Sequence, residues 1–186
     1  MNSNETHKTT TSGAQEVQYS YPYHYLPIMT REGFSQHRYW SWGYRYLGRL
    51  KVVFDLLHGL EFRSLLDIGC GDGRFLRETR TAYNDIQLTG IDTSEKAISL
   101  ARQMNPGLEF QQRDILVSTL ESKWDVITLL DVIEHIPPQS LPDFMMAAAR
   151  MLNPGGSLII TVPHLNEKLI PKHYQHFNEE KLKALL

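Results

Sequence analysis

Three glycines stand at alternate positions directly after a short apolar run that contains one acid. The run is Leu65-Leu66-Asp67-Ile68, and Gly69, Gly71 and Gly73 follow it. Because glycine has no Cβ atom, a ligand can approach the backbone amides closely where a buried strand turns into a helix. The Gly-x-Gly-x-Gly spacing differs from the Gly-x-Gly-x-x-Gly pattern that binds a dinucleotide pyrophosphate. We therefore expect this turn to bind a different nucleoside.

Acidic side chains close the apolar segments that follow the turn. Asp92 lies 20 residues beyond Asp72, a separation at which the acid ending a second strand accepts hydrogen bonds from ribose hydroxyls. Asp114 is placed to accept from an exocyclic amine of a purine, with Ile115 against the ring, and Asp67 to meet an ammonium group. Together these partners describe a ligand with a ribose, an adenine and an ammonium group but no phosphate.

Strands and helices alternate regularly around these residues. Strands are predicted over 87–91, 108–113, 126–130 and 158–162, helices over 94–104 and 141–152, and a turn over 153–156. This alternation is typical of βαβ units. The sequence therefore predicts an α/β fold with a Rossmann-like, mainly parallel sheet and flanking helices, whose ligand lies beyond the carboxyl ends of the strands.

Five motifs, in this order, make the chain similar to the class I S-adenosylmethionine-dependent methyltransferases over about 52–177. They are Leu-Asp-Ile-Gly-Cys-Gly-Asp-Gly (66–73), Gly-Ile-Asp-Thr-Ser (90–94), Arg-Asp-Ile (113–115), Asp-Val-Ile-Glu-His-Ile-Pro (131–137) and Leu-Asn-Pro-Gly-Gly-Ser-Leu-Ile-Ile-Thr-Val-Pro (152–163). The resemblance implies S-adenosylmethionine as the cofactor.

The resemblance also implies a role for each matching residue. The methionine part of the cofactor is expected at Asp67, Gly69, Gly71 and Gly73, the ribose at Asp92, and the adenine at Asp114 and Ile115. Cys70, Thr93 and Leu130 complete the predicted cofactor-binding set, with Cys70 as a small packing residue rather than a nucleophile.

Candidate catalytic residues follow the fourth and fifth predicted strands. Since the cofactor carries the hard chemistry, the protein must position the acceptor and, for a hydroxyl, supply a base. His135 is the first candidate base and His164 the second, with Asp131 and Glu134 beside them. The alternative is that both imidazoles only cap loops or contact the backbone.

The segment Asp131-x-x-Glu134-His135, followed later by His173 and His176, is similar to a motif in two metal-using branches of the family. These branches are the small-RNA terminal 2′-O-methyltransferases and the ubiquinone-pathway O-methyltransferases. Their motif is Glu-x-x-Glu-His, whereas this chain has Asp at the first position. Because the set of carboxylate and imidazole ligands is incomplete, no metal is predicted.

Composition narrows the class of protein. The 186 residues suffice for one domain, and the net charge of -2 argues against nucleic acid as a partner. The single cysteine excludes an internal disulfide, and we expect no signal peptide and no membrane partner, hence a cytoplasmic protein. We predict a disordered tail over 1–20, an N-terminal arm and cap helix over 21–59, and the methyltransferase domain over 60–186.

The predicted cap helix, between residues 35 and 59, carries two stripes. Tyr46, Leu47, Leu50, Val53, Phe54 and Leu57 recur at helical spacing and are expected to face the core. Arg38, Arg45 and Arg49 form a basic stripe that, with Tyr25, is predicted to hold an acidic small-molecule substrate; the alternative is a solvated basic face.

The sheet is expected to lack the last two strands of the family's usual seven, because only 23 residues follow Pro163. The apolar strand 158–162 would then be an exposed edge, covered by a second copy in a homodimer or left open in a shortened form. The predicted function is methyl transfer to an oxygen or nitrogen of a small molecule. The alternative is a non-catalytic or truncated cofactor-binding module that acts through a partner.

Overall fold

The computed structural model describes residues 28–30, 33–35 and 43–186. Within them, β1 (Ile28–Thr30) and β2 (Gly33–Ser35) form a small antiparallel hairpin that precedes a larger α/β unit. The predicted tail and the candidate substrate residues Tyr25 and Arg38 lie outside the described residues.

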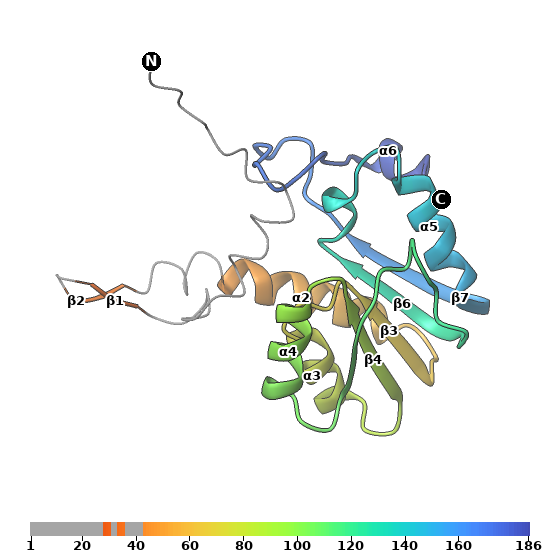
Figure 1. The fold of residues 1–186 in the computed structure, drawn as a ribbon, viewed down its shortest axis with the longest axis horizontal. Coiled ribbons are helices and arrows are strands. Elements are labelled where there is room, and N and C mark those ends of the chain that lie inside the picture. The colour runs from red at the N-terminus through yellow and green to blue at the C-terminus, as the bar shows by residue number, and fades with distance from the viewer. Residues whose placement is uncertain (1–27, 31–32, 36–42) are drawn as a thin grey trace, which may run out of the picture.

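Five parallel strands form the main sheet in the order β5-β4-β3-β6-β7 (Figure 1). Their bounds are β3 (Ser64–Ile68), β4 (Gln87–Asp92), β5 (Glu109–Gln112), β6 (Trp124–Leu130) and β7 (Leu152–Thr161). The chain runs outward from β3 to β5 and then returns to β6 on the other side of β3. The carboxyl ends of β3 and β6 therefore mark the point at which the strand order reverses, where α/β sheets bind ligands. The predicted α/β fold with a parallel sheet is confirmed.

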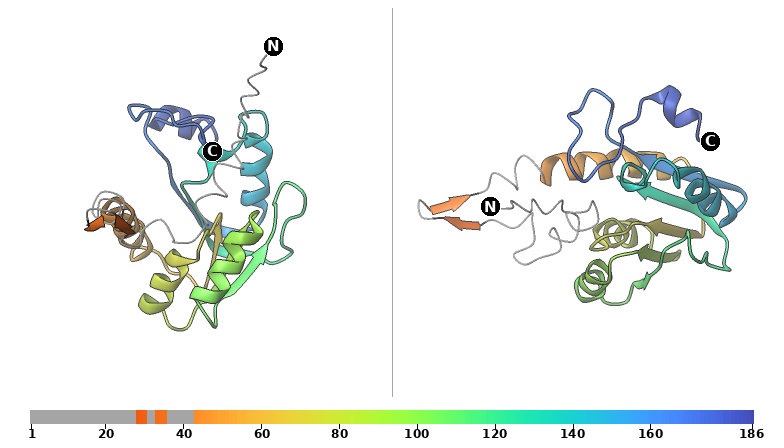
Figure 2. Two further views of the ribbon diagram at one scale, coloured as in Figure 1. Left: turned by 60° about the vertical axis from the view of Figure 1, so that its left-hand side comes forward. Right: turned by 45° about the horizontal axis from the view of Figure 1, so that its top comes forward.

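Helices cover both faces of this sheet (Figure 2). α2 (Tyr44–Leu57), α3 (Arg74–Ala82) and α4 (Glu95–Met104) pack on one face. α5 (Leu141–Arg150) packs on the other, together with the short 3-10 turn η3 (Ile133–His135) and the C-terminal helix α6 (Glu179–Lys183). This three-layer arrangement leaves the carboxyl edge of the sheet between the two helical layers.

Successive residues of the central strands enter two separate cores. Leu65 and Val126 are buried against α2, α3 and α4, whereas their neighbours Leu66 and Ile127 are buried on the side of α5. Since side chains alternate between the two faces of a strand, this pattern explains why the strands read as continuous apolar runs.

The core face of α2 is narrower than the sequence predicts. Leu50, Val53 and Leu57 are buried, and Tyr46 and Phe54 are partly buried against the same core. The prediction is wrong for Leu47, which is 47% exposed. Leu47 lies at the margin of the buried stripe, about 60° round the helix from Leu50, where α2 faces solvent.

The predicted turn over 153–156 is also wrong, because these residues lie inside β7. Trp124 pairs with Leu152 and Val126 pairs with Ser157, so β7 advances five residues while β6 advances two. The extra residues form a bulge in which Gly155 has a φ of +79°. A bulge bends the strand without ending it, which is why turn residues occur here.

The outer edge of β7 has no neighbouring strand among the described residues. Its coverage by a second copy stays a prediction, which light scattering tests. In the part of the chain that the structure describes, no helix combines the length and apolar character needed to cross a membrane.

Candidate active site

A cavity of about 280 Å³ opens at the carboxyl ends of the central strands. Most of its lining residues stand at or just after the ends of β3, β4, β5 and β6. Such a volume lies near the lower end of the range for small-molecule sites. Seven of the residues predicted from sequence line it, namely Gly69, Asp92, Thr93, Asp114, Ile115, Asp131 and His135. Residues far apart in the chain thus meet at one edge of the sheet.

The glycine turn between β3 and α3 needs glycine for its backbone conformation. Gly69, Gly71 and Gly73 have φ angles of +77°, +55° and +73°, a region that other residues rarely adopt. A Cβ atom on Gly69 would also lie 2.5 Å from Cγ2 of Val132, on the wall of the cavity. Gly69 therefore presents bare backbone to the cavity.

Asp92 holds this turn in place from the end of β4. Its Oδ2 accepts a hydrogen bond from the amide of Gly71 at 3.0 Å, and its Oδ1 accepts from the amide of Ser94 at 2.9 Å. The side chain is buried and lines the cavity. A carboxylate has further lone pairs, so Asp92 can also accept from ligand hydroxyls.

Asp114 and Ile115 form the side of the cavity beyond β5. Asp114 is exposed, and its Oδ1 accepts from the amide of Leu116 at 2.9 Å, whereas Ile115 is buried. The neighbouring Arg113, which sequence reasoning did not single out, also lines the cavity, and its amide donates to the carbonyl of Asp92. An apolar surface beside a carboxylate suits a purine ring.

Asp67 is buried at the end of β3 and does not line the cavity. Thr128 donates a hydrogen bond to its Oδ1 at 2.6 Å. Burial, followed by the charges of Asp92 and Asp72, raises the pKa of Asp67 to about 7, against the lowering effect of Thr128. Its predicted contact with an ammonium group stays a prediction.

Replacing Asp67 with asparagine should flatten the pH dependence of stability. The folded state raises the pKa of this carboxyl from 3.8 to about 7. Its contribution to the free energy of unfolding is therefore complete below pH 3.8 and is lost as the pH rises through 7. The loss amounts to roughly 4 kcal/mol at most. Urea unfolding of both proteins at several pH values measures it, and parallel curves would contradict the assignment.

Asp131 follows β6 in the left-handed region, with a φ of +56°. Its amide donates to the carbonyl of Thr161 at 3.0 Å, and its carboxylate forms an ion pair with Arg49 of α2. Burial raises the pKa of Asp131, an effect that Arg49 partly offsets. Asp131 therefore lines the cavity and ties the cap helix to it.

Arg49, a member of the basic stripe predicted on the cap helix, reaches the site through its ion pair with Asp131. Arg45 is exposed and is not among the residues that line the cavity. A substrate contact of Arg45 stays a prediction.

His135 has its ring orientation and tautomer fixed by the backbone. Its Nδ1 lies 2.8 Å from the carbonyl oxygen of Lys172. Since a carbonyl only accepts, Nδ1 carries the hydrogen and the neutral ring keeps a lone pair on Nε2. Burial lowers the pKa of His135. This imidazole can therefore accept a proton at Nε2.

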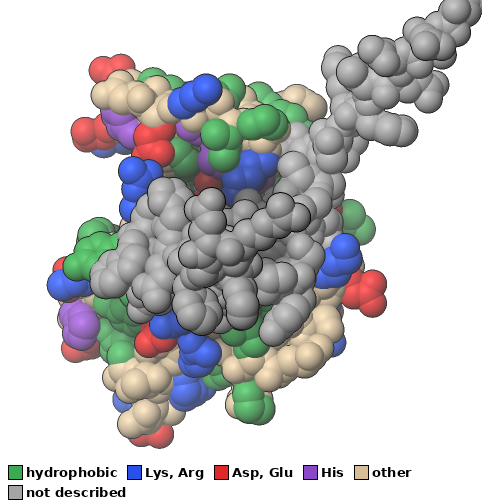
Figure 3. Space-filling view, turned by 90° about the vertical axis from the view of Figure 1, so that its left-hand side faces the viewer, with side chains coloured by type: hydrophobic (Ala, Val, Ile, Leu, Met, Phe, Trp, Pro, Cys, Tyr) green, Lys and Arg blue, Asp and Glu red, His purple; other side chains and the backbone are tan. Residues whose placement is uncertain are grey.

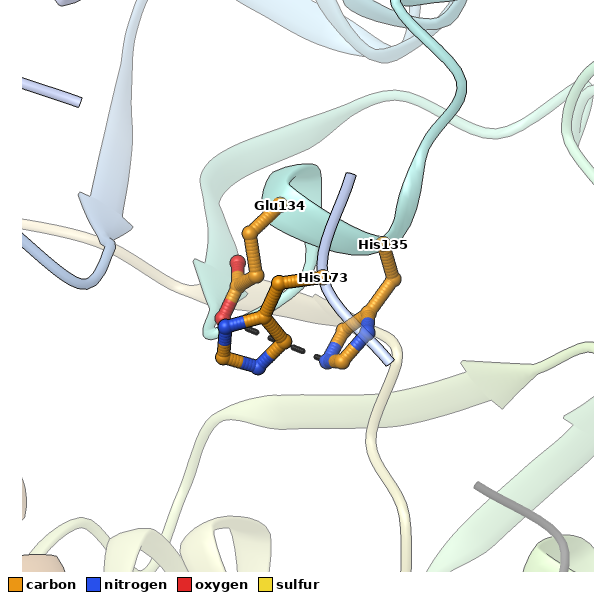
Figure 4. Close-up of side chains that lie close together, drawn as sticks. All are labelled: Glu134, His135 and His173. Atoms are coloured by element: carbon orange, nitrogen blue, oxygen red, sulfur yellow. Dashed lines mark ion pairs between the residues drawn. The ribbon is translucent and has the colours of Figure 1, made fainter. Parts of the chain in front are cut away.

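Glu134, His135 and His173 point toward one another beside the cavity (Figure 4). One ligand atom of each lies within 4.8 Å of the others. Glu134 Oε1 is 4.0 Å from His135 Nε2, wider than the roughly 3–3.5 Å between neighbouring ligands around Zn²⁺. Asp131 is paired with Arg49, and Nδ1 of His173 lies 2.8 Å from Nε2 of His176. These residues do not form a closed ligand set, and the absence of a metal stays a prediction.

The second candidate base, His164, is exposed and is not among the cavity residues. Its Nδ1 accepts from the amide of Asn166 at 3.2 Å, which is the loop-capping role that the sequence left open. Cys70, Gly71, Gly73 and Leu130 also do not line the cavity. Burial raises the pKa of the Cys70 thiol, in keeping with a packing residue.

Tyr174 and Phe144 line the cavity together with Ile136 and Pro137, and sequence reasoning missed all four. The amide of Tyr174 donates to the carbonyl of Glu134 at 2.8 Å, which fastens the segment after β7 to η3. Figure 3 shows basic, acidic and histidine side chains intermixed on the coloured part of one face of the molecule. That part of the face has no broad field of one sign.

A glycine turn after the first strand of the sheet and an acid after the second define a nucleoside-binding α/β domain. The family model described as "Methyltransferase domain" matches residues 39–186, so the chain belongs to this family of S-adenosylmethionine-dependent methyltransferases. The resemblance inferred from the motifs is confirmed.

Among curated proteins, the chain is 36% identical over 126 residues to the ubiquinone biosynthesis O-methyltransferase of Alkalilimnicola ehrlichii, covering 64% of this chain and 49% of that protein. It is 31% identical over 127 residues to the enzyme of the same name from Bordetella avium, covering 64% and 51%. The chain thus spans about half the length of the curated relatives it matches.

Solved structures show the same fold. The plantazolicin methyltransferase BpumL, in complex with a pentazolic desmethylPZN analog and S-adenosylhomocysteine, is 26% identical with a TM-score of 0.54, over 64% of this chain and 47% of that chain. The N-methyltransferase NodS from Bradyrhizobium japonicum WM9, in complex with S-adenosylhomocysteine, is 24% identical with a TM-score of 0.55, over 63% and 62%. The NodS likeness concerns the fold alone.

Proposed function

We propose that this chain transfers a methyl group from S-adenosylmethionine to an oxygen or nitrogen of a small-molecule acceptor. The observation that carries the proposal is one cavity lined both by the predicted nucleoside partners, Asp92 and Asp114, and by a candidate base, His135. An oxygen acceptor is supported by the curated relatives, whose printed name is O-methyltransferase.

The residues present fit the cofactor at one end of the cavity. Asp92 would hold the ribose hydroxyls, Asp114 and Ile115 the adenine, and the bare backbone at Gly69 the methionine part. When bound, S-adenosylmethionine supplies a methyl group that its sulfonium makes electrophilic.

The other end of the cavity suits the acceptor. His135 offers a lone pair at Nε2, because Nδ1 donates to the carbonyl of Lys172. It therefore accepts the proton that leaves the acceptor hydroxyl or amine. Ile136, Pro137 and Phe144 also line the cavity, and their apolar side chains would limit the access of water to the acceptor.

The direct test is incubation with methyl-tritiated S-adenosylmethionine and two probes, catechol as an oxygen acceptor and benzylamine as a nitrogen acceptor. Transfer of label to either probe supports the proposal. Binding of S-adenosylhomocysteine by calorimetry without labelling of any acceptor from a wider metabolite panel would favour the non-catalytic module.

Replacing Asp92 with alanine should weaken binding of S-adenosylhomocysteine by about 10- to 150-fold, the scale of 1.5–3 kcal/mol for one hydrogen-bonding charged group. The variant loses both the ribose partner and the acceptor for the Gly71 amide. Calorimetry measures the affinity, with the exposed Asp85→Ala as the matched control. Equal affinities in wild type and Asp92→Ala would reject the ribose assignment.

A further inference from the structure

Glu134 is a buried acid whose carboxylate has no hydrogen-bond partner on another residue. The residue is 0% exposed, and neither Oε1 nor Oε2 is hydrogen-bonded to another residue. An ionised carboxylate in such a place loses its hydration without replacement, which strongly disfavours the charged form. A buried acid of this kind must bind a proton or face a positive charge.

The nearest titratable atom is Nε2 of His135, 4.0 Å from Oε1 of Glu134 (Figure 4). As the Lys172 carbonyl holds the hydrogen on Nδ1, the neutral ring directs a lone pair from Nε2. An ionised Glu134 and a neutral His135 would then place two hydrogen-bond acceptors 4.0 Å apart. One proton in that gap, on either atom, removes the repulsion.

Charged groups from the same segment and from two others surround the pair. Asp131, three residues before Glu134, raises the pKa of Glu134. The backbone amide of Glu134 itself, Lys172 in the segment after β7 and Arg49 on α2 lower it. His173 adds no charge at neutral pH, since burial and its neighbours lower its pKa to about 4. Burial is the largest effect on Glu134 and raises its pKa to about 8.

We propose that Glu134 and His135 bind one proton jointly and act as a single proton-accepting unit at the acceptor end of the cavity. This inference rests on the proposed function. Once the shared proton has passed to bulk water, Nε2 of His135 accepts the proton of the acceptor's O–H or N–H group. A lone pair of that oxygen or nitrogen would form the bond to the methyl carbon while the carbon–sulfur bond of S-adenosylmethionine breaks, its electron pair staying on sulfur. His135 is the catalytic residue. Glu134 is a positioning residue that stabilises the imidazolium formed.

The test is the NMR titration of His135 in protein labelled with ¹³C-histidine, with His135→Asn identifying the signal. A pair that shares a proton titrates in two macroscopic steps, so the wild-type signal should show two. Glu134→Gln should leave one step. Glu134→Asp, which keeps the carboxylate, should restore two. The exposed Glu121→Gln is the matched control and should also show two.

A single step in the wild type, unchanged in Glu134→Gln, would overturn the proposal. The proposal would also be overturned if equimolar ZnCl₂ shifted the His135 signal of the wild type but not that of Glu134→Gln, because a metal would then fill the gap. A single step in the wild type overturns the proposal even where Glu134→Gln fails to fold. Since neither cofactor nor acceptor is present, two steps without methyl transfer would leave the pair intact and reject the proposed function alone.

Discussion

Replacing His135 with asparagine should lower the rate of methyl transfer by about 10²–10⁴-fold, the usual contribution of a general base. Asparagine keeps a polar side chain of similar reach but offers no nitrogen lone pair to accept a proton. The affinity for S-adenosylhomocysteine should stay within a few fold, since the proposed nucleoside partners are elsewhere: Asp92 ends β4 and Asp114 follows β5, whereas His135 is in η3. Single-turnover labelling of the responsive acceptor measures the rate, and calorimetry measures the affinity.

The matched control is His164→Asn, which removes the second candidate base. His164 is exposed and its Nδ1 accepts from the amide of Asn166, so we expect a rate close to that of the wild type. A large loss of the methyl-transfer rate in His164→Asn, with no loss in His135→Asn, would exchange the roles of the two histidines. Equal rates in all three proteins would remove the general base from the mechanism.

Replacing Gly73 with alanine should destabilise the fold by about 2–5 kcal/mol. The left-handed φ of +73° costs about 1–2 kcal/mol for a residue with a Cβ atom. That atom would also lie 2.4 Å from Cζ of Phe110 and 2.8 Å from Nδ2 of Asn105. Both neighbours are buried, and Nδ2 of Asn105 donates to the carbonyls of Asp72 and Ala101, so neither side chain can move cheaply. Overpacking of this kind costs about 1–3 kcal/mol more.

Gly107→Ala separates the two causes. Gly107 has a φ of +90°, and a Cβ atom there would meet nothing within 4 Å. Its substitution should therefore cost only the backbone term, about 1–2 kcal/mol. Urea unfolding of the two variants gives the difference. Equal losses in the free energy of unfolding would show that the side chains around Gly73 move aside more easily than their distances indicate.

The fold and the cofactor end of the site follow from local sequence signals. Gly69 and Asp92 stand at fixed positions relative to apolar runs, so the strand ends that carry them can be located without a structure. The cap-helix position Leu47 and the bulge at Gly155 were misjudged because burial and strand pairing depend on partners elsewhere in the chain.

The acceptor end could not be assembled from the sequence. The ion pair of Arg49 with Asp131 joins residues 82 positions apart, and nothing in either neighbourhood encodes the pairing. The tautomer of His135 depends on the backbone carbonyl of Lys172, which has no side-chain signature. Tyr174 comes from the segment after β7, and only the folded chain shows that it lines the cavity.

A crystal structure of the chain with S-adenosylhomocysteine tests the central claim most directly. The account predicts the nucleoside in the cavity, with ribose hydroxyls on Asp92, adenine beside Asp114 and Ile115, and the sulfur directed toward His135. A nucleoside bound elsewhere, or a cavity that S-adenosylhomocysteine does not enter at saturating concentration, would contradict it.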